Sequence, residues 1–79
     1  MPPLYWLVMI VCAGPSTCLA WDHFMAPVTV EECVTARNLR LAELSLASVR
    51  AAGVCVTEAM RGRLLSDLDA FGVSWRESA

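Results

Sequence analysis

Four cysteines and one histidine are the residues of this 79-residue chain whose types could hold a metal or perform nucleophilic catalysis. They are Cys12, Cys18, His23, Cys33 and Cys55. The first four are separated by five, four and nine residues, which does not match the two-to-four-residue knuckles of zinc sites. No Ser or Cys near His23 forms a nucleophile motif, so a catalytic triad has no support. We therefore expect no metal, no cofactor and no catalysis.

Cys33 and Cys55 form a candidate disulfide, since a pair of cysteines in an oxidising compartment suggests a bridge. An unbroken helix over residues 30–52 would keep Cys33 about 28 Å from the end of that helix, whereas the three residues to Cys55 span only about 10 Å. An intrachain bridge therefore requires the helix to end early, near Ser45 or Ser48. Otherwise the two cysteines bond between chains or remain free thiols, and the sequence leaves all three arrangements open.

Whether the protein reaches an oxidising compartment depends on the role of an apolar, uncharged segment that runs from Leu4 to Gly14. Its eleven residues would rise about 16 Å as a helix, roughly half the thickness of a bilayer core, so a membrane span fits poorly. An export signal fits better, because Cys18-Leu19-Ala20 supplies small residues for cleavage before Trp21. However, the chain has no Lys or Arg near its start. We interpret residues 1–20 as a signal peptide or apolar N-terminal helix, with a retained membrane-associated helix and a buried strand as alternatives.

The remaining residues, 21–79, are expected to form a small helical domain. Thr29-Val30-Glu31-Glu32 matches a capping box and predicts a helix over about 30–52, ended by Gly53. Thr57 can cap a second helix over about 58–71. The short joint between these helices makes them neighbours, so the predicted fold is an all-α helical hairpin after an apolar N-terminal segment.

The first predicted helix is apolar on two nearly opposite sides, and the second helix can cover only one of them. The other side is a candidate interaction stripe of Leu39, Ala42, Leu46 and Val49. Without the N-terminal segment, this stripe requires a protein partner or a second copy, and two hairpins would form a four-helix bundle. We therefore expect a homo-oligomer or a protein partner, and no small-molecule substrate.

The segment from Ala51 to Thr57 resembles the turn of helix-turn-helix DNA-binding proteins, in which an Ala-Gly-Val step precedes a polar-capped recognition helix. The resemblance implies Arg61 and Arg63 as candidate DNA contacts. The net charge of −2 and the acidic residues of the same helix oppose this function, because DNA binding requires a basic surface.

These patterns predict a small exported protein, secreted or periplasmic, with an interaction or structural role and no catalysis. One alternative is a membrane-associated microprotein subunit that docks on a larger complex, with residues 4–13 at the membrane. Another is the helix-turn-helix-like DNA-binding regulator. The sequence identifies no partner or pathway.

Overall fold

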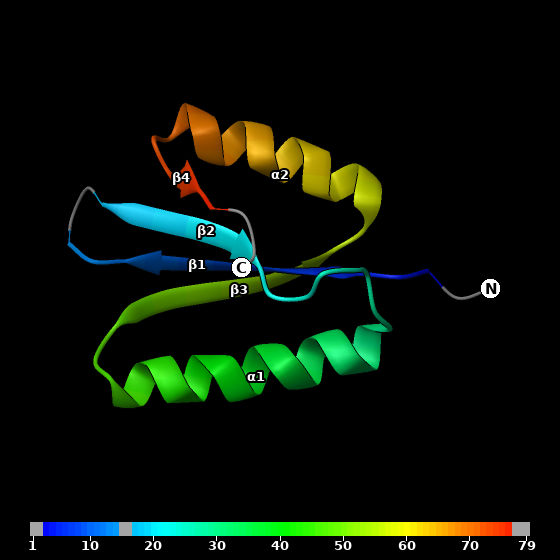
Figure 1. The fold of residues 1–79 in the computed structure, drawn as a ribbon, viewed down its shortest axis with the longest axis horizontal. Coiled ribbons are helices and arrows are strands. Elements are labelled where there is room, and N and C mark those ends of the chain that lie inside the picture. The colour runs from blue at the N-terminus through cyan, green and yellow to red at the C-terminus, as the bar shows by residue number, and fades with distance from the viewer. Residues whose placement is uncertain (1–2, 15–16, 77–79) are drawn as a thin grey trace.

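The computed structural model describes residues 3–14 and 17–76, and these residues form a mixed α/β fold (Figure 1). In chain order the elements are β1 (Trp6–Cys12), β2 (Cys18–Asp22), α1 (Val30–Leu46), β3 (Arg50–Val56), α2 (Glu58–Ala70) and β4 (Ser74–Trp75). The strands form a four-stranded sheet in the order β3-β1-β2-β4. Strand β1 is antiparallel to both of its neighbours, and β4 is parallel to β2. The prediction of an all-α helical hairpin is therefore wrong.

The apolar N-terminal segment forms one of the two inner strands of the sheet, β1. Leu7, Val8 and Met9 of β1 are fully buried, which explains why the strand reads as a continuous apolar run with no polar alternation. The fold thus has the buried strand that the sequence offered only as an alternative. Cleavage after Ala20 would remove β1 and most of β2. Among the described residues, none of the helices is both long and apolar enough to span a bilayer.

Helix α1 begins where the capping box predicted. The Thr29 hydroxyl accepts a hydrogen bond from the Glu32 backbone N–H at 3.3 Å. The helix ends at Leu46 and not near residue 52, and Ser48 adopts a positive φ of 58° as the chain turns back. Residues 50–56 then pair antiparallel along the whole of β1. This long-range pairing overrides the helical preference of the Ala-Ala sequence in β3.

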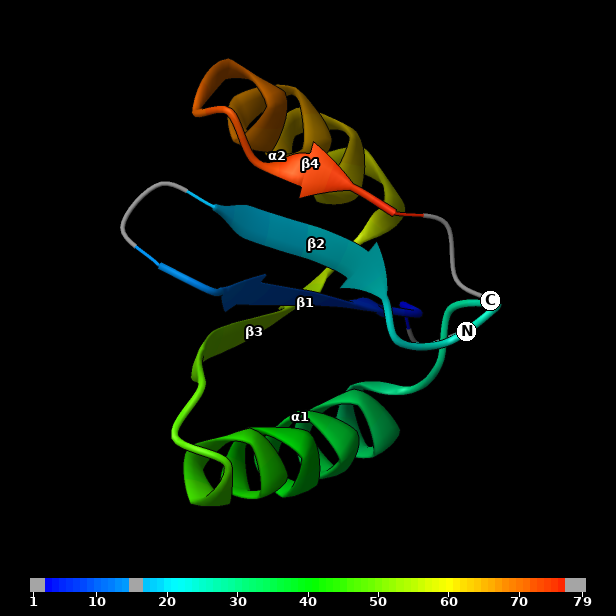
Figure 2. The same cartoon turned by 60° about the vertical axis from the view of Figure 1, so that its left-hand side comes forward.

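Successive residues of β1 point to opposite faces of the sheet, and each face carries one helix. Leu7 and Met9 pack with Cys33 of α1 in the main core cluster. On the other face, Trp6 of β1 contacts α2. Figures 1 and 2 show α1 and α2 on opposite sides of the strands. The two helices do not pair with each other, so the predicted hairpin cannot be the unit of a four-helix bundle.

Helix α1 approaches the sheet closely at Gly53 of β3. A Cβ atom at this position would lie 2.8 Å from Arg37 Cγ and 3.0 Å from Met9 Sδ, so only glycine fits without a shift of its neighbours. A disulfide between Cys33 and Cys55 fastens the same two elements. The α1 side of the sheet is therefore the tightly packed side.

Helix α2 is held less tightly. Thr57 caps it by accepting a hydrogen bond from the Met60 backbone N–H, and Gly72 follows its end with a φ of 79°. None of the α2 residues, all of which the structure describes, is buried. The partly buried side of the helix consists of Arg61, Leu64, Leu65 and Leu68.

Candidate functional site

The α2-facing side of the sheet is organised in rows of side chains that run across the strands. Residues that pair directly between neighbouring strands point to the same face, with side chains in contact distance. From β2 through β1 to β3, three such rows are Asp22–Val8–Val54, Ala20–Ile10–Ala52 and Cys18–Cys12–Arg50. The row with Asp22 and the row with Arg50 lie at opposite ends of this face.

At the first end, which we call the closed end, Arg61 of α2 fastens the helix to the sheet. Its Nε and Nη2 atoms donate hydrogen bonds to the two carboxylate oxygens of Asp22, at 3.0 and 2.5 Å. Its guanidinium carbon lies 4.6 Å from the ring centroid of Trp6 and 5.6 Å from that of Trp75. The Trp6 indole N–H donates to the carboxylate of Glu58.

The side chains of Arg61 and Asp22 are only 21% and 13% exposed. The hydrogen bond to Asp22 raises the pKa of Arg61 further above its ordinary value, and the neighbouring negative charges act in the same direction despite partial burial. The arginine therefore stays charged, and two of its three nitrogens bond to Asp22. This arrangement joins α2 to β1, β2 and β4, so its role is to hold the helix on the sheet.

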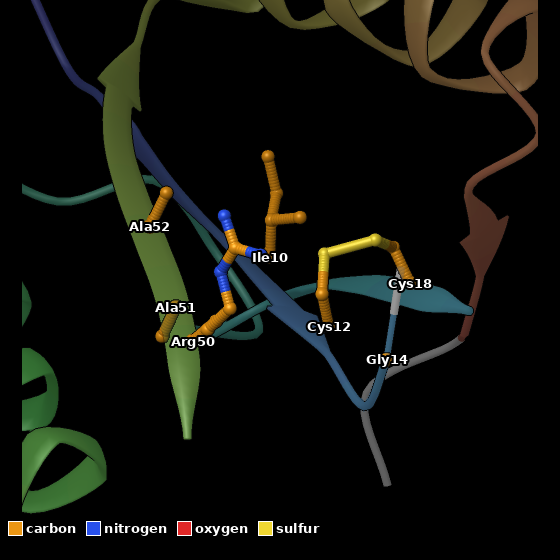
Figure 3. A pocket seen from close by; sticks show the side chains of 7 residues that line it. All are labelled: Ile10, Cys12, Gly14, Cys18, Arg50, Ala51 and Ala52. Carbon is orange, nitrogen blue, oxygen red and sulfur yellow. A yellow bond between two sulfur atoms is a disulfide. The ribbon is translucent and has the colours of Figure 1, made fainter. Parts of the chain in front are cut away.

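At the opposite end, which we call the open end, the sheet face carries a pocket of about 280 Å³. Its lining residues are Ile10, Cys12, Gly14, Cys18, Arg50, Ala51 and Ala52. Figure 3 shows the side chains of Arg50 and Ile10 and the Cys12–Cys18 disulfide on the same side of the sheet. Arg50 is exposed, and within the described part of the chain its side chain makes no hydrogen bond or ion pair. The open end thus combines the exposed side chain of Arg50, a disulfide and small or apolar pocket-lining residues such as Ile10 and Ala52.

The two disulfides occupy different environments. Cys33–Cys55 joins α1 to β3, and Cys33 is completely buried in the core cluster. Cys12–Cys18 joins two directly paired residues at the β1–β2 turn, where both are partly exposed in the wall of the pocket. All four cysteines are therefore bridged within the chain. Two disulfides fit an oxidising, extracellular setting.

The predicted interaction stripe lies mostly on the outer surface of α1. Leu39 is 63% exposed and Leu46 is 89% exposed, with the exposed Ala42 between them. Val49 lies beyond the end of α1 and is half-buried. Beside the N-terminal half of the stripe is a groove of about 410 Å³, lined by Phe24, Glu31, Glu32, Thr35, Ala36 and Leu39.

The candidate DNA contacts are not arranged as the helix-turn-helix resemblance implied. Residues 50–56 form strand β3, so the expected turn between two helices is absent from this described segment. Arg61 faces Asp22 on the sheet and is not a free basic side chain, whereas Arg63 is exposed. His23 is exposed, and its ring meets that of Phe24 edge-on, at 4.7 Å between centroids.

Arg50 was not predicted as a site residue, and Arg61 was predicted only as a DNA contact, because the surroundings of each depend on strand pairing. The usable signal was a charged residue at one end of each strand, namely Asp22 as the last residue of β2 and Arg50 as the first residue of β3. Comparisons of the chain with protein-family models, curated proteins and solved structures find no match.

Proposed function

We propose that this chain is a small exported, disulfide-stabilised α/β protein that works by protein–protein association and performs no catalysis. The contact surface is the outer face of α1, and the partner is a second copy of the chain. One observation carries the proposal: a protruding apolar side chain, Leu46, and an apolar groove beside Thr35 lie on the same face of α1.

The spacing of these two features favours a second copy. Leu46 and Thr35 are eleven residues apart, which is about 16 Å along the helix and close to three full turns. In an antiparallel pair of α1 helices related by a two-fold axis, Leu46 of each copy reaches the groove of the other. A surface that contains both a projection and its matching recess is self-complementary, as a two-fold interface requires.

Side-chain size supports the same arrangement. Centring the two-fold axis between residues 40 and 41 places the large Leu39 opposite the small Ala42 of the other copy, and Leu46 opposite Thr35. The polar residues Asn38 and Glu43 then flank the apolar contact. An interface formed by a single helix from each copy is small, so the dimer is expected to be transient.

Sedimentation equilibrium over a concentration series tests this function. The expected result is a reversible monomer–dimer equilibrium, with a dissociation constant that rises about tenfold or more in Leu46→Glu. Phe71→Glu is the matched control, because Phe71 is 85% exposed at the end of α2 and lies outside the proposed contact. A monomer at every concentration, or an equal effect of both variants, would overturn the proposal.

The two disulfides support export. However, the apolar N-terminal segment is part of the sheet, so export cannot involve its removal. Because β1 and β2 are the two inner strands of the sheet, the working protein is expected to retain residues 6–22. Intact mass measured on protein from the extracellular fraction of its native host should show a chain with these residues and four fewer hydrogens than the fully reduced form. A chain that begins at Trp21 would contradict this part of the proposal.

A further inference from the structure

We propose that the Cys12–Cys18 disulfide is a site of thiol–disulfide exchange with small thiols that carry a carboxylate. In this proposal Arg50 binds the carboxylate and determines which of the two sulfur atoms is attacked. This inference is independent of the α1 contact. It rests on the row Cys18–Cys12–Arg50, in which three strands place a disulfide and a cation next to each other.

Access distinguishes this disulfide from the other one. Both of its cysteines line the open pocket, so an incoming thiolate can reach a sulfur atom there (Figure 3). Cys33 is fully buried between α1 and the sheet, and Cys55 is partly buried against the same core cluster and lines no described pocket, so a thiolate should reach the Cys33–Cys55 bridge less readily. The rate of exchange depends on access to the sulfur as well as on the thiols themselves, so the two bridges should react at very different rates.

The positive charge of Arg50 decides which cysteine leaves as the thiolate. In the register of the sheet, Arg50 is the direct neighbour of Cys12, and Cys18 is one strand further away. A guanidinium stabilises a thiolate beside it, and a stabilised thiolate is the better leaving group. The external thiolate is therefore expected to attack Cys18 Sγ and to displace Cys12 as the thiolate next to Arg50.

In the first exchange step the bond between the two Sγ atoms breaks, a mixed disulfide forms between Cys18 and the external thiol, and Cys12 receives the electron pair. A second external thiolate can then attack the external sulfur of the mixed disulfide, which forms the oxidised external disulfide and displaces Cys18 as a thiolate, so that both cysteines are reduced. The carboxylate of the small thiol pairs with Arg50, which makes no such contact within the described part of the chain.

The test is a time course of the folded protein with reduced glutathione at neutral pH, quenched with acid and analysed by peptide mass spectrometry. We expect the first adduct on Cys18, at a rate about tenfold or more above any reaction of Cys33 or Cys55. Arg50→Gln should slow the reaction of glutathione several-fold, and it should slow uncharged 2-mercaptoethanol less. Arg63→Gln is the matched control, because it removes an equal charge from an exposed position on α2.

Three results would overturn the inference: a first adduct on Cys33 or Cys55, a first adduct on Cys12, or equal rates for Arg50→Gln and Arg63→Gln. Circular dichroism of each variant before the reaction separates a change in reactivity from a loss of folding. The state of association measured in the same samples keeps this result distinct from the proposed α1 contact.

Discussion

The two ends of the α2-facing side of the sheet each carry an arginine, and the two arginines have opposite environments. Arg61 at the closed end is paired with Asp22 and lies over two tryptophan rings. Arg50 at the open end is exposed beside a disulfide and an apolar pocket. The same sheet face thus uses one cation to hold a helix and leaves the other accessible to solvent.

The difference follows from where α2 contacts the sheet. This helix begins directly after β3, so its first turns, with Glu58 and Arg61, lie over the end of the sheet that contains Trp6 and Asp22. The end with Cys12 and Cys18 is held together instead by a covalent cross-link between adjacent strands. A disulfide needs little burial to stabilise two strands, so this end can remain open to ligands without loss of order.

The largest effect is expected when the closed end is broken. Asp22→Ala leaves Arg61 charged and largely shielded from water with no carboxylate partner on the sheet, which should lower the free energy of unfolding by about 3 kcal/mol. Urea denaturation followed by tryptophan fluorescence measures this change.

The control for this variant is the surface pair formed by Arg40 and Glu43, whose side chains are 41% and 63% exposed. Glu43→Gln should cost less than about 0.5 kcal/mol, because exposed ion pairs contribute little. If Asp22→Ala and Glu43→Gln had equal effects, the closed end would not be the anchor of α2.

A smaller loss is expected when the cross-link at the open end is removed. The loop closed by Cys12 and Cys18 is short, with a sequence separation of 6, so the double variant Cys12→Ala/Cys18→Ala should be destabilised by about 2 kcal/mol. Cys33 and Cys55 enclose a longer loop, with a separation of 22, and replacing them should cost more. Thermal unfolding monitored by circular dichroism gives both values, and the reverse order would contradict the entropic account of these bridges.

The sequence contained the local signals of the fold but not its long-range pairing. The side-chain cap at Thr29 and the one at Thr57 are set by neighbouring residues, and both are confirmed. The predicted end of the first helix was wrong, because Ala51 and Ala52 have high helical preference and become a strand only through pairing with β1. The two-sided burial of β1 hid its identity, because a short apolar run has no distinguishing period.

The candidate site was harder to anticipate. The exposed part of the stripe, Leu39 to Leu46, could be read from helical spacing alone. The pocket at the open end requires the register that aligns Cys18, Cys12 and Arg50, and no local pattern encodes that register. The Cys33–Cys55 bridge became geometrically accessible only because α1 ends at Leu46, within the region near Ser45 and Ser48 where the sequence argument required a break.

A gain in stability is expected from Gly62→Ala in α2. A Cβ atom at Gly62 would have nothing within 4 Å, and alanine is favoured over glycine in a helix interior by about 1 kcal/mol. Because α2 is held at the closed end, the added stability should not change the rate of thiol exchange at Cys12–Cys18. Urea denaturation and the glutathione time course together test this separation, and a slower exchange in the stabilised variant would show that opening of α2 controls access to the pocket.

The smallest effect on folding is expected at Arg50, and it completes the contrast with Asp22 and Arg61. Arg50→Gln removes a charge that is exposed and unpaired within the described residues, so the free energy of unfolding should change by less than about 0.5 kcal/mol. Urea denaturation of Arg50→Gln beside Asp22→Ala gives the comparison directly. A loss at Arg50 as large as that at Asp22 would mean that both arginines serve the fold, and the open end would then be a second structural contact with no cation available for a ligand.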